Sequence, residues 1–271
     1  MVAQSIPSVP MLRRQASRCV ACCAAPICSK PILFFASKKM RPMVDAFVTQ
    51  YLALRAREGR LYTDDVLRCL PYPQGTAYTS EWSVRARSAR RLRRYFAQRT
   101  PMRILEVGCG NGWLSHYLSL IPSCEVLGID VNGFELEQAG RVFHRPNLSF
   151  RQTDLAALHA SGFDCILFAA SFQYFADVKA TLGECFRRLV RGGSVLIIDT
   201  YFYSSKDRAA ARTRSAAYFE ALGAAALKAW YFHHSMEDFA PFRYRVRNPL
   251  SDGLRKLAGP VFPWLQIDRP L

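Results

Sequence analysis

The stretch R-I-L-E-V-G-C-G-N-G, residues 103–112, decides the fold of this chain. An aliphatic run of strand length leads directly into a turn that holds Gly108, Gly110 and Gly112, and a helical apolar pattern follows from Trp113. Glycines in such a turn allow the backbone to pass close to a bound ligand. A strand, a glycine-rich turn and a helix in this order predict one unit of an α/β sheet, with the turn close to a bound ligand.

The pattern of this unit continues along the chain, because short β-branched and aliphatic runs alternate with helical stretches. The expected strands are 103–107, 125–129, 148–151, 163–169, 194–199, 242–247 and 262–267. The expected helices are 113–120, 133–142, 177–190 and 206–226. Such alternation is typical of a mostly parallel sheet covered by helices. We therefore expect an α/β fold with a doubly wound, mostly parallel sheet of seven strands.

The sequence before this region predicts helices. Apolar residues recur at helical spacing over 43–57, Thr63 is expected to cap a short helix, and Thr79 or Ser80 is expected to cap a longer one. The expected buried stripe of the longer helix is Trp82, Ala86, Ala89, Leu92 and Phe96, and its other faces carry Arg85, Arg87, Arg90, Arg91, Arg93 and Arg94. The arginines indicate either a solvated face or a phosphate-binding surface. Residues 43–99 are thus expected to form a helical cap and residues 100–271 the main domain, with substrate-binding insertions in 200–245.

Residues 1–42 differ from the rest in composition. The first 43 residues hold seven Lys or Arg and no acidic residue. We expect a disordered or presequence-like segment, or a stretch upstream of a start at Met40 or Met43. The cluster Cys19, Cys22, Cys23 and Cys28 lacks a second ligand pair at zinc-finger spacing, so no metal site is expected.

The overall composition limits location and partners. The net charge is +16, half of the residues are apolar, and no apolar stretch reaches the roughly 18 residues of a membrane span. The five cysteines beyond the N-terminal cluster are scattered, which favours a reducing compartment. We expect a cytoplasmic protein without a membrane span, with organellar targeting by the N-terminal segment as the alternative.

Charged residues near the glycine turn indicate the kind of ligand. Trp113 stands where a dinucleotide site has its third glycine, and Glu106 precedes the turn, where a carboxylate would repel a pyrophosphate. The same carboxylate suits the ammonium and sulfonium charges of S-adenosylmethionine. Asp130 follows the second strand, 22 residues after Gly108, and is placed to accept hydrogen bonds from ribose hydroxyls. Asp154 follows the third strand, where it could receive an adenine amino group or cap a helix.

With these residues the sequence resembles the class I, Rossmann-like S-adenosylmethionine-dependent methyltransferases. The segments that carry the resemblance are E-V-G-C-G-N-G, G-I-D-V-N, F-D-C-I-L-F-A-A-S-F-Q-Y-F and L-V-R-G-G-S-V-L-I-I-D, within about residues 100–200. The resemblance implies that S-adenosylmethionine is the cofactor. It implies that the methionine part is surrounded by Glu106, Gly108, Gly110 and Gly112, the ribose by Asp130, and the adenine by Asp154 and Leu155. Ser171, Phe172 and Gln173 would border the transferable methyl group.

Three residues are candidates for a catalytic role. A general base is required only if the acceptor must lose a proton, and the candidates are His233, His234 and Tyr174. Asp199, Tyr201 and Tyr203 are expected pocket walls near the ends of strands.

Missing motifs narrow the class of acceptor. No Asn/Asp-Pro-Pro-aromatic motif follows the fourth strand, and no Pro-Cys pair is present, which disfavours methylation of nucleic-acid amino groups and pyrimidine carbons. Many aromatic residues flank the core. We expect a small organic or lipid-like acceptor, methylated at oxygen. An RNA methyltransferase and a cofactor-binding relative without catalysis are the alternatives.

Overall fold

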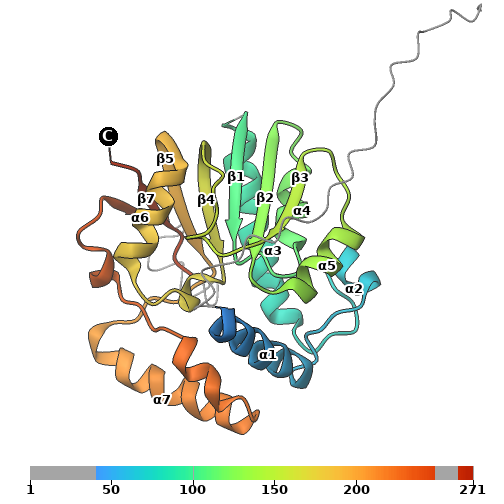
Figure 1. Cartoon of the computed structure of the whole chain (residues 1–271), viewed down its shortest axis with the longest axis vertical. Helices are drawn as coiled ribbons and strands as arrows, with labels where there is room; N and C mark the ends of the chain where they lie inside the picture. The colour runs from blue at the N-terminus through green and yellow to red at the C-terminus, as the bar shows by residue number, and fades with distance from the viewer. Residues whose placement is uncertain (1–40, 100, 248–261, 271) are drawn as a thin grey trace, which may run out of the picture. The chain divides into compact units, whose positions relative to one another are not determined.

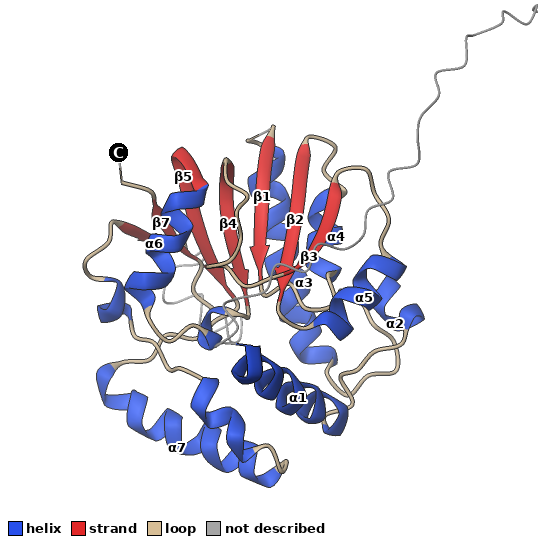
Figure 2. Ribbon diagram, viewed as in Figure 1, coloured by secondary structure: helices blue, strands red, loops and turns tan. Residues whose placement is uncertain are grey.

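The computed structural model describes residues 41–99, 101–247 and 262–270. They contain a seven-stranded sheet flanked by helices, which confirms the expected fold class (Figures 1 and 2). The expectations for residues 1–40, including the cluster Cys19, Cys22, Cys23 and Cys28, lie outside the described residues.

The strands lie in the order β3-β2-β1-β4-β5-β7-β6. Their bounds are β1 Met102–Val107, β2 Cys124–Asp130, β3 Leu148–Gln152, β4 Phe163–Ala169, β5 Leu189–Ile198, β6 Tyr244–Val246 and β7 Leu265–Asp268. The first five strands pair in parallel, and β7 pairs antiparallel with both β5 and β6. All seven expected strands are therefore present, and five have bounds within two residues of those expected.

The fifth strand begins earlier than the sequence indicates. We expected a helix to residue 190 and a strand from 194, but the helix ends at Arg188 and β5 starts at Leu189. The pairing of β4 with β5 shifts register between Phe163 and Cys165. The start of β5 has an irregular register and contains Gly192 and Gly193. The sequence there lacks the regular apolar pattern from which a strand is predicted.

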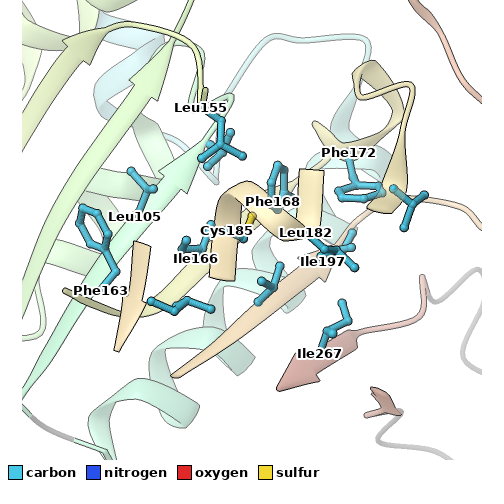
Figure 3. Close-up of a cluster of buried hydrophobic side chains, with 14 of the residues drawn as sticks. Leu105, Leu155, Phe163, Ile166, Phe168, Phe172, Leu182, Cys185, Ile197 and Ile267 are labelled. Atoms are coloured by element: carbon cyan, nitrogen blue, oxygen red, sulfur yellow. The ribbon is translucent and has the colours of Figure 1, made fainter. Parts of the chain in front are cut away.

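The central strands are buried on both faces, which explains their continuous apolar runs. Leu105 of β1 lies opposite Leu127 of β2 and Ile166 of β4. One face carries a core cluster that includes side chains of β4, β5 and the helix α6 (Figure 3). The other face packs against the helices α3 and α4. Both faces of a parallel sheet must be covered in this way because both are apolar.

Helices surround the sheet and precede it in the chain. Their bounds are α1 Arg41–Arg57, α2 Asp64–Arg68, α3 Thr79–Ala97, α4 Trp113–Ser119, α5 Gly133–Val142, α6 Val178–Arg188 and α7 Ser205–Ala221, with short 3₁₀ turns η1 Phe172–Tyr174, η2 Ala225–Trp230 and η3 Met236–Phe239. A separate core cluster joins α1 to α7 and η2 through Leu54, Phe219 and Leu227. None of the helices in the described ranges is long and apolar enough to cross a membrane.

The caps of the early helices confirm one expectation and correct another. Thr63 caps α2, and its side chain accepts a hydrogen bond from Val66 N. The expectation that Thr79 or Ser80 caps α3 is wrong, because Tyr78 occupies the cap position. Thr79 lies inside the helix, where its hydroxyl donates to the carbonyl of Thr76 at 3.0 Å. All five residues of the expected buried stripe of α3 are buried.

Candidate functional site

The glycine turn after β1 has a backbone that other residues would adopt at a cost. Gly108, Gly110 and Gly112 have φ values of 72°, 52° and 73°. A Cβ atom on Gly108 would lie 2.6 Å from Ser171 Cβ, and one on Gly110 would lie 3.3 Å from Glu135 Oε2. The turn is therefore closely surrounded at its first and middle glycines, where only a residue without a side chain fits.

Gly112 has a different neighbourhood. A Cβ atom there would lie 2.6 Å from the ring of Phe150 and 2.8 Å from Ala139. These neighbours belong to β3 and α5. This glycine therefore allows close packing of the first helix after the turn.

Two cavities adjoin the turn. The central cavity, of about 220 Å³, opens at the carboxyl ends of β1, β2 and β4 and is lined by Met43, Val44, Phe47, Tyr51, Val107, Gly108, Ile129, Asp130, Val131, Asn132, Glu135, Thr153, Asp154, Leu155, Ala170, Ser171, Tyr174, Phe175 and Trp230. The turn cavity, of about 80 Å³, is lined by Tyr51, Arg55, Arg60, Tyr62, Glu81, Trp82, Arg85, Cys109, Gly110, Asn111, Trp113 and Glu135. Tyr51 and Glu135 belong to both walls, so the cavities are neighbours.

Asp130 connects the glycine turn to the end of β2. Its Oδ2 accepts a hydrogen bond from Gly110 N at 2.8 Å, and its Oδ1 accepts one from Asn132 N at 2.8 Å. Burial raises the pKa of this carboxyl group, although the backbone hydrogen bonds oppose the rise. Each carboxylate oxygen has a further lone pair, and the residue lines the central cavity. Asp130 is thus available to a ligand while it holds the turn in place.

Glu106 lies behind the turn, on the wall of neither cavity. Its carboxyl group is buried and accepts a hydrogen bond from Ser115 Oγ of α4 at 2.5 Å. Burial raises the pKa of Glu106 to about 8, so the group is mostly protonated at pH 7. From the sequence we expected the carboxylate of Glu106 to lie beside the methionine part of S-adenosylmethionine. Side chains alternate across a strand, and that of Glu106 points toward α4 while its neighbour Val107 lines the cavity.

Glu135 supplies a carboxyl group on the cavity wall that the sequence interpretation missed. It is buried, lines both cavities, and its Oε2 accepts a hydrogen bond from Asn132 Nδ2 at 3.0 Å. Burial raises the pKa of Glu135 to about 7. The only sequence signal is an acidic residue three positions after the helix cap Asn132, which is common at helix starts. That signal does not distinguish a cap from a binding residue.

Three of the residues expected near the adenine and the methyl group lie together on the central cavity. Asp154, Leu155 and Ser171 all line it. Asp154 Oδ1 also accepts a hydrogen bond from Ala157 N at 2.7 Å, so it caps a turn as well. Ser171 Oγ donates to the carbonyl of Val107 at 2.6 Å. This bond ties the end of β4 to the end of β1, beside Gly108.

The helix α1 forms one side of the central cavity. Figure 1 shows α1 crossing below the tips of the central strands. The ring of Phe47 lies 5.5 Å from that of Tyr174 and 5.9 Å from that of Trp230, and the ring of Tyr51 lies 6.0 Å from that of Tyr174. The aromatic residues of α1, η1 and η2 therefore enclose the site on the side opposite the strands.

Of the three catalytic candidates, Tyr174 alone lies on a wall of the central cavity. His233 and His234 are buried elsewhere. His233 Nε2 lies 2.9 Å from Ser215 Oγ, and His234 Nδ1 lies 3.9 Å from Asp238 Oδ2. Burial lowers the pKa of both histidines. His233 thus contacts α7 through Ser215, and the ring of His234 lies 5.2 Å from that of Phe172, which spacing alone does not reveal.

The remaining expected residues do not line the central cavity; they are Phe172, Gln173, Asp199, Tyr201 and Tyr203. Phe172 is fully buried in the core, and Tyr201 is 56% exposed. Gln173 donates from Nε2 to the carbonyl of Ala170 at 2.6 Å and so fixes the segment after β4. The structure thus brings together the expected residues at the ends of the strands. The expected residues in the later connecting segments lie away from the central cavity.

The model of a methyltransferase domain family matches residues 104–193. This match covers the strands β1 to β4, the glycine turn and the start of β5. The chain contains a methyltransferase domain. Its methyltransferase domain therefore includes every residue of the glycine turn and both acids that follow β2 and β3.

Known relatives match part of this chain. The malonyl-(acyl-carrier protein) O-methyltransferase of Bacillus cytotoxicus is 29% identical over 112 residues, which are 41% of this chain and 39% of the relative. The trans-aconitate 2-methyltransferase of Deinococcus radiodurans is 32% identical over 115 residues, which are 42% of this chain and 44% of the relative. The chain thus spans about two fifths of the length of these relatives.

The likeness in structure extends further than the likeness in sequence. A plantazolicin methyltransferase solved with S-adenosylhomocysteine superposes with a TM-score of 0.51 and 16% sequence identity, covering 86% of this chain and 100% of that one. At this level of identity the superposition shows a shared fold. The shared fold thus extends beyond the residues that the family model matches.

Proposed function

We propose that this chain transfers a methyl group from S-adenosylmethionine to an oxygen atom of a small organic or lipid-like acceptor. The observation that carries the proposal is the meeting of the glycine turn, Asp130 and Asp154 on one cavity at the carboxyl ends of β1, β2 and β4. Open α/β sheets bind ligands at this end. The two named relatives support the reaction class, since both are methyltransferases and one is named for transfer to oxygen.

The central cavity fits the adenosine part of the donor. Asp154 and Leu155 would hold the adenine, and Asp130 would accept hydrogen bonds from the ribose hydroxyls. The turn cavity would take the amino-acid part, with Gly110 in its wall and the Glu135 carboxylate facing the ammonium group. Ser171 and Tyr174 would then border the methyl group.

The sulfonium donor supplies a methyl group that is already activated. The protein must therefore position the two reactants and keep water away from them. The rings of Phe47, Tyr51 and Tyr174 are suited to the exclusion of water, since they form an aromatic wall across the opening of the strands.

RNA remains a second candidate acceptor because of one surface. Arg87, Arg90, Arg93 and Arg94 of α3 are exposed, whereas Arg85 and Arg91 are engaged, by Glu81 and by the carbonyl of Arg247. An exposed basic face attracts phosphates. A cofactor-binding relative without catalysis is the third candidate.

We also place the protein in the cytoplasm. Cys109, Cys124, Cys165 and Cys185 are buried free thiols. Such cysteines suit a reducing compartment.

Labelled S-adenosylmethionine separates the candidates. The protein is incubated with separate metabolite, lipid and RNA extracts, and we expect label in a metabolite or lipid product. Label in RNA, with binding that weakens steeply as salt is added, would replace the proposal by RNA methylation. Calorimetric binding of S-adenosylhomocysteine without label in any fraction would favour the non-catalytic relative.

A further inference from the structure

A third cavity, which we call the β5 cavity, lies beside the proposed donor site. It measures about 300 Å³ and is lined by Ser80, Glu81, Val84, Arg85, Ala170, Asp199 and Phe262. The first four of these residues belong to α3, and Ala170 and Asp199 directly follow β4 and β5. The cavity therefore lies at the same end of the sheet as the glycine turn.

The β5 cavity borders both parts of the proposed donor site. It shares Ala170 with the central cavity. It shares Glu81 and Arg85 with the turn cavity. In S-adenosylmethionine the sulfur atom joins the nucleoside to the amino-acid part, so the methyl group lies where the two cavities meet. A space that touches both is where an acceptor would meet the methyl group.

The backbone at this cavity is strained. Ala170 and Asp199 have φ values of 54° and 52°, and they are the non-glycine residues with positive φ among those described. Ala170 N donates to the carbonyl of Ile198 at 3.0 Å, so the two strained positions are neighbours. Each such residue costs about 1 kcal/mol or more. Strained backbone of this kind is often found where a side chain must be held in a particular orientation. Of the two residues, Asp199 has the ionisable side chain.

The carboxyl group of Asp199 is held at one oxygen. Ser88 Oγ donates to Oδ1 at 2.5 Å, and the described residues make no hydrogen bond to Oδ2. The charged groups around it, Glu81, Arg85 and Arg91, all come from α3. Arg85 is already paired with Glu81 at 2.6 Å. Burial raises the pKa of Asp199 to about 6, so at pH 7 the group is ionised and able to accept a proton.

We propose that the β5 cavity binds the methyl acceptor and that Asp199 accepts the proton of the acceptor's hydroxyl group. This inference rests on the proposed function and assigns its acceptor class, a hydroxyl group on an apolar molecule. As the hydroxyl oxygen forms its bond to the methyl carbon, the bond from carbon to sulfur breaks and its electron pair stays on sulfur. The hydroxyl proton passes to Asp199 Oδ2. The products are a methyl ether and neutral S-adenosylhomocysteine.

The same geometry excludes carboxylate acceptors. A carboxylate has no proton to give, and in this cavity it would lie beside the negative charge of Asp199. Arg85, the one cation among the described residues of the wall, already has a carboxylate partner. Val84, Ala170 and Phe262 provide an apolar surface for the rest of the acceptor.

Two probes that share a naphthalene ring test the proposal, 2-naphthol with a hydroxyl group and 2-naphthoate with a carboxylate. Each is titrated calorimetrically into the full chain saturated with S-adenosylhomocysteine. We expect the naphthol to bind at least about tenfold more tightly than the naphthoate, a difference of about 1.4 kcal/mol. Failure of the wild type to bind S-adenosylhomocysteine would defeat the proposed function itself. Binding of that nucleoside without any preference for the naphthol would defeat the acceptor assignment alone.

Substitutions on the wall of the β5 cavity test whether the naphthol binds there. Val84→Trp and the milder Val84→Phe fill the β5 cavity and touch neither donor cavity, so they should abolish naphthol binding and leave S-adenosylhomocysteine affinity within about twofold. Asp199→Asn should let the naphthoate bind at least about fivefold better and should slow methylation of the naphthol about 100-fold. Asp65→Asn, at an exposed carboxylate on α2, is the matched control. Naphthol binding that survives both Val84 variants, or naphthoate binding unchanged in Asp199→Asn, overturns the proposal.

Discussion

The two ends of the sheet handle charge in opposite ways. At the carboxyl ends of the strands, Glu106, Asp130, Glu135 and Asp199 are wholly or largely withdrawn from water, and burial raises the pKa of each. At the amino ends the charges remain in water, as in the pair of Arg103 with Glu125 at 3.1 Å, whose side chains are 45% and 64% exposed. The comparison teaches that one end bears the energetic cost of desolvated carboxyl groups and the other does not. We expect substitutions at the two ends to differ accordingly.

The largest difference in S-adenosylhomocysteine affinity is expected between substitutions at two glycines that both have a positive φ. Gly110→Val should weaken S-adenosylhomocysteine binding about 100-fold or more, because the new side chain meets Glu135 and fills the turn cavity. Gly192→Val is the matched control, since Gly192 also has a positive φ, 79°, but has open space around its Cβ position at the amino end of β5. Calorimetry measures both affinities. Equal losses in the two variants would mean that backbone strain, rather than intrusion into a site, causes the effect.

The second difference concerns two aspartates that each accept a backbone hydrogen bond. Asp130→Ala should weaken S-adenosylhomocysteine binding about 30-fold, or about 2 kcal/mol, because the ribose and the turn both lose a charged acceptor. Asp164→Ala removes the equivalent bond from Arg103 N, 2.7 Å long, at the amino end. It should cost about 1 kcal/mol of unfolding free energy and leave the affinity unchanged. Unchanged affinity in Asp130→Ala would contradict the assignment of the ribose site.

A smaller effect should appear in the pH dependence of stability. Because the folded pKa of Glu106 is about 8, the folded chain keeps a proton that the unfolded chain releases near its lower, ordinary pKa. Its contribution to stability is therefore fully present below the unfolded pKa and is lost as the pH rises to about 8. We expect the free energy of unfolding of the ligand-free protein to fall by roughly 1 kcal/mol per pH unit in this window.

Urea titrations at a series of pH values measure this slope. Glu106→Gln should reduce it, since the amide has no proton to release. Glu125→Gln, at the exposed carboxylate of β2, is the control and should keep the wild-type slope. An identical slope in wild type and Glu106→Gln would show that the buried carboxyl group is ionised in the folded protein.

The smallest effect is expected at the amino-end surface. Arg245 pairs with Asp268 at 2.7 Å, and the arginine side chain is 53% exposed. Arg245→Ala should change the free energy of unfolding by less than about 1 kcal/mol, because exposed ion pairs contribute little. Thermal unfolding and S-adenosylhomocysteine calorimetry check this. A large loss of affinity would mean that the two ends of the sheet are coupled.

The sequence predicted the arrangement of the strand ends well. The strands repeat an apolar pattern, and parallel strands bring their carboxyl ends to one edge, so Gly108, Asp130 and Ser171 could be expected to meet. Their placement on one cavity agrees with that expectation, while their part in binding stays a prediction. The same reasoning could not show which way Glu106 points, because a strand pattern gives alternation but not which face meets which helix.

Long-range contacts limited the rest of the prediction. The apolar stripe of residues 43–57 indicated a helix with a buried face, but periodicity does not say what that face covers. The structure places Phe47 and Tyr51 on the central cavity. Glu135 was missed because its helix-start position has an ordinary structural explanation. His233 and His234 were candidates by location in a variable segment, and their burial follows from how that segment folds back.

The position of α1 has a consequence for the electrostatics of the whole site. The seven strands pair with one another and need no residue of α1 to do so. A chain shortened past Tyr51 would thus keep the sheet and the acids at its edge, yet water would enter where Phe47 and Tyr51 had been. The local dielectric constant would rise, and the carboxyl groups on the cavity would titrate closer to their values in free solution. The polarity of the central cavity therefore depends on a helix from outside the sheet.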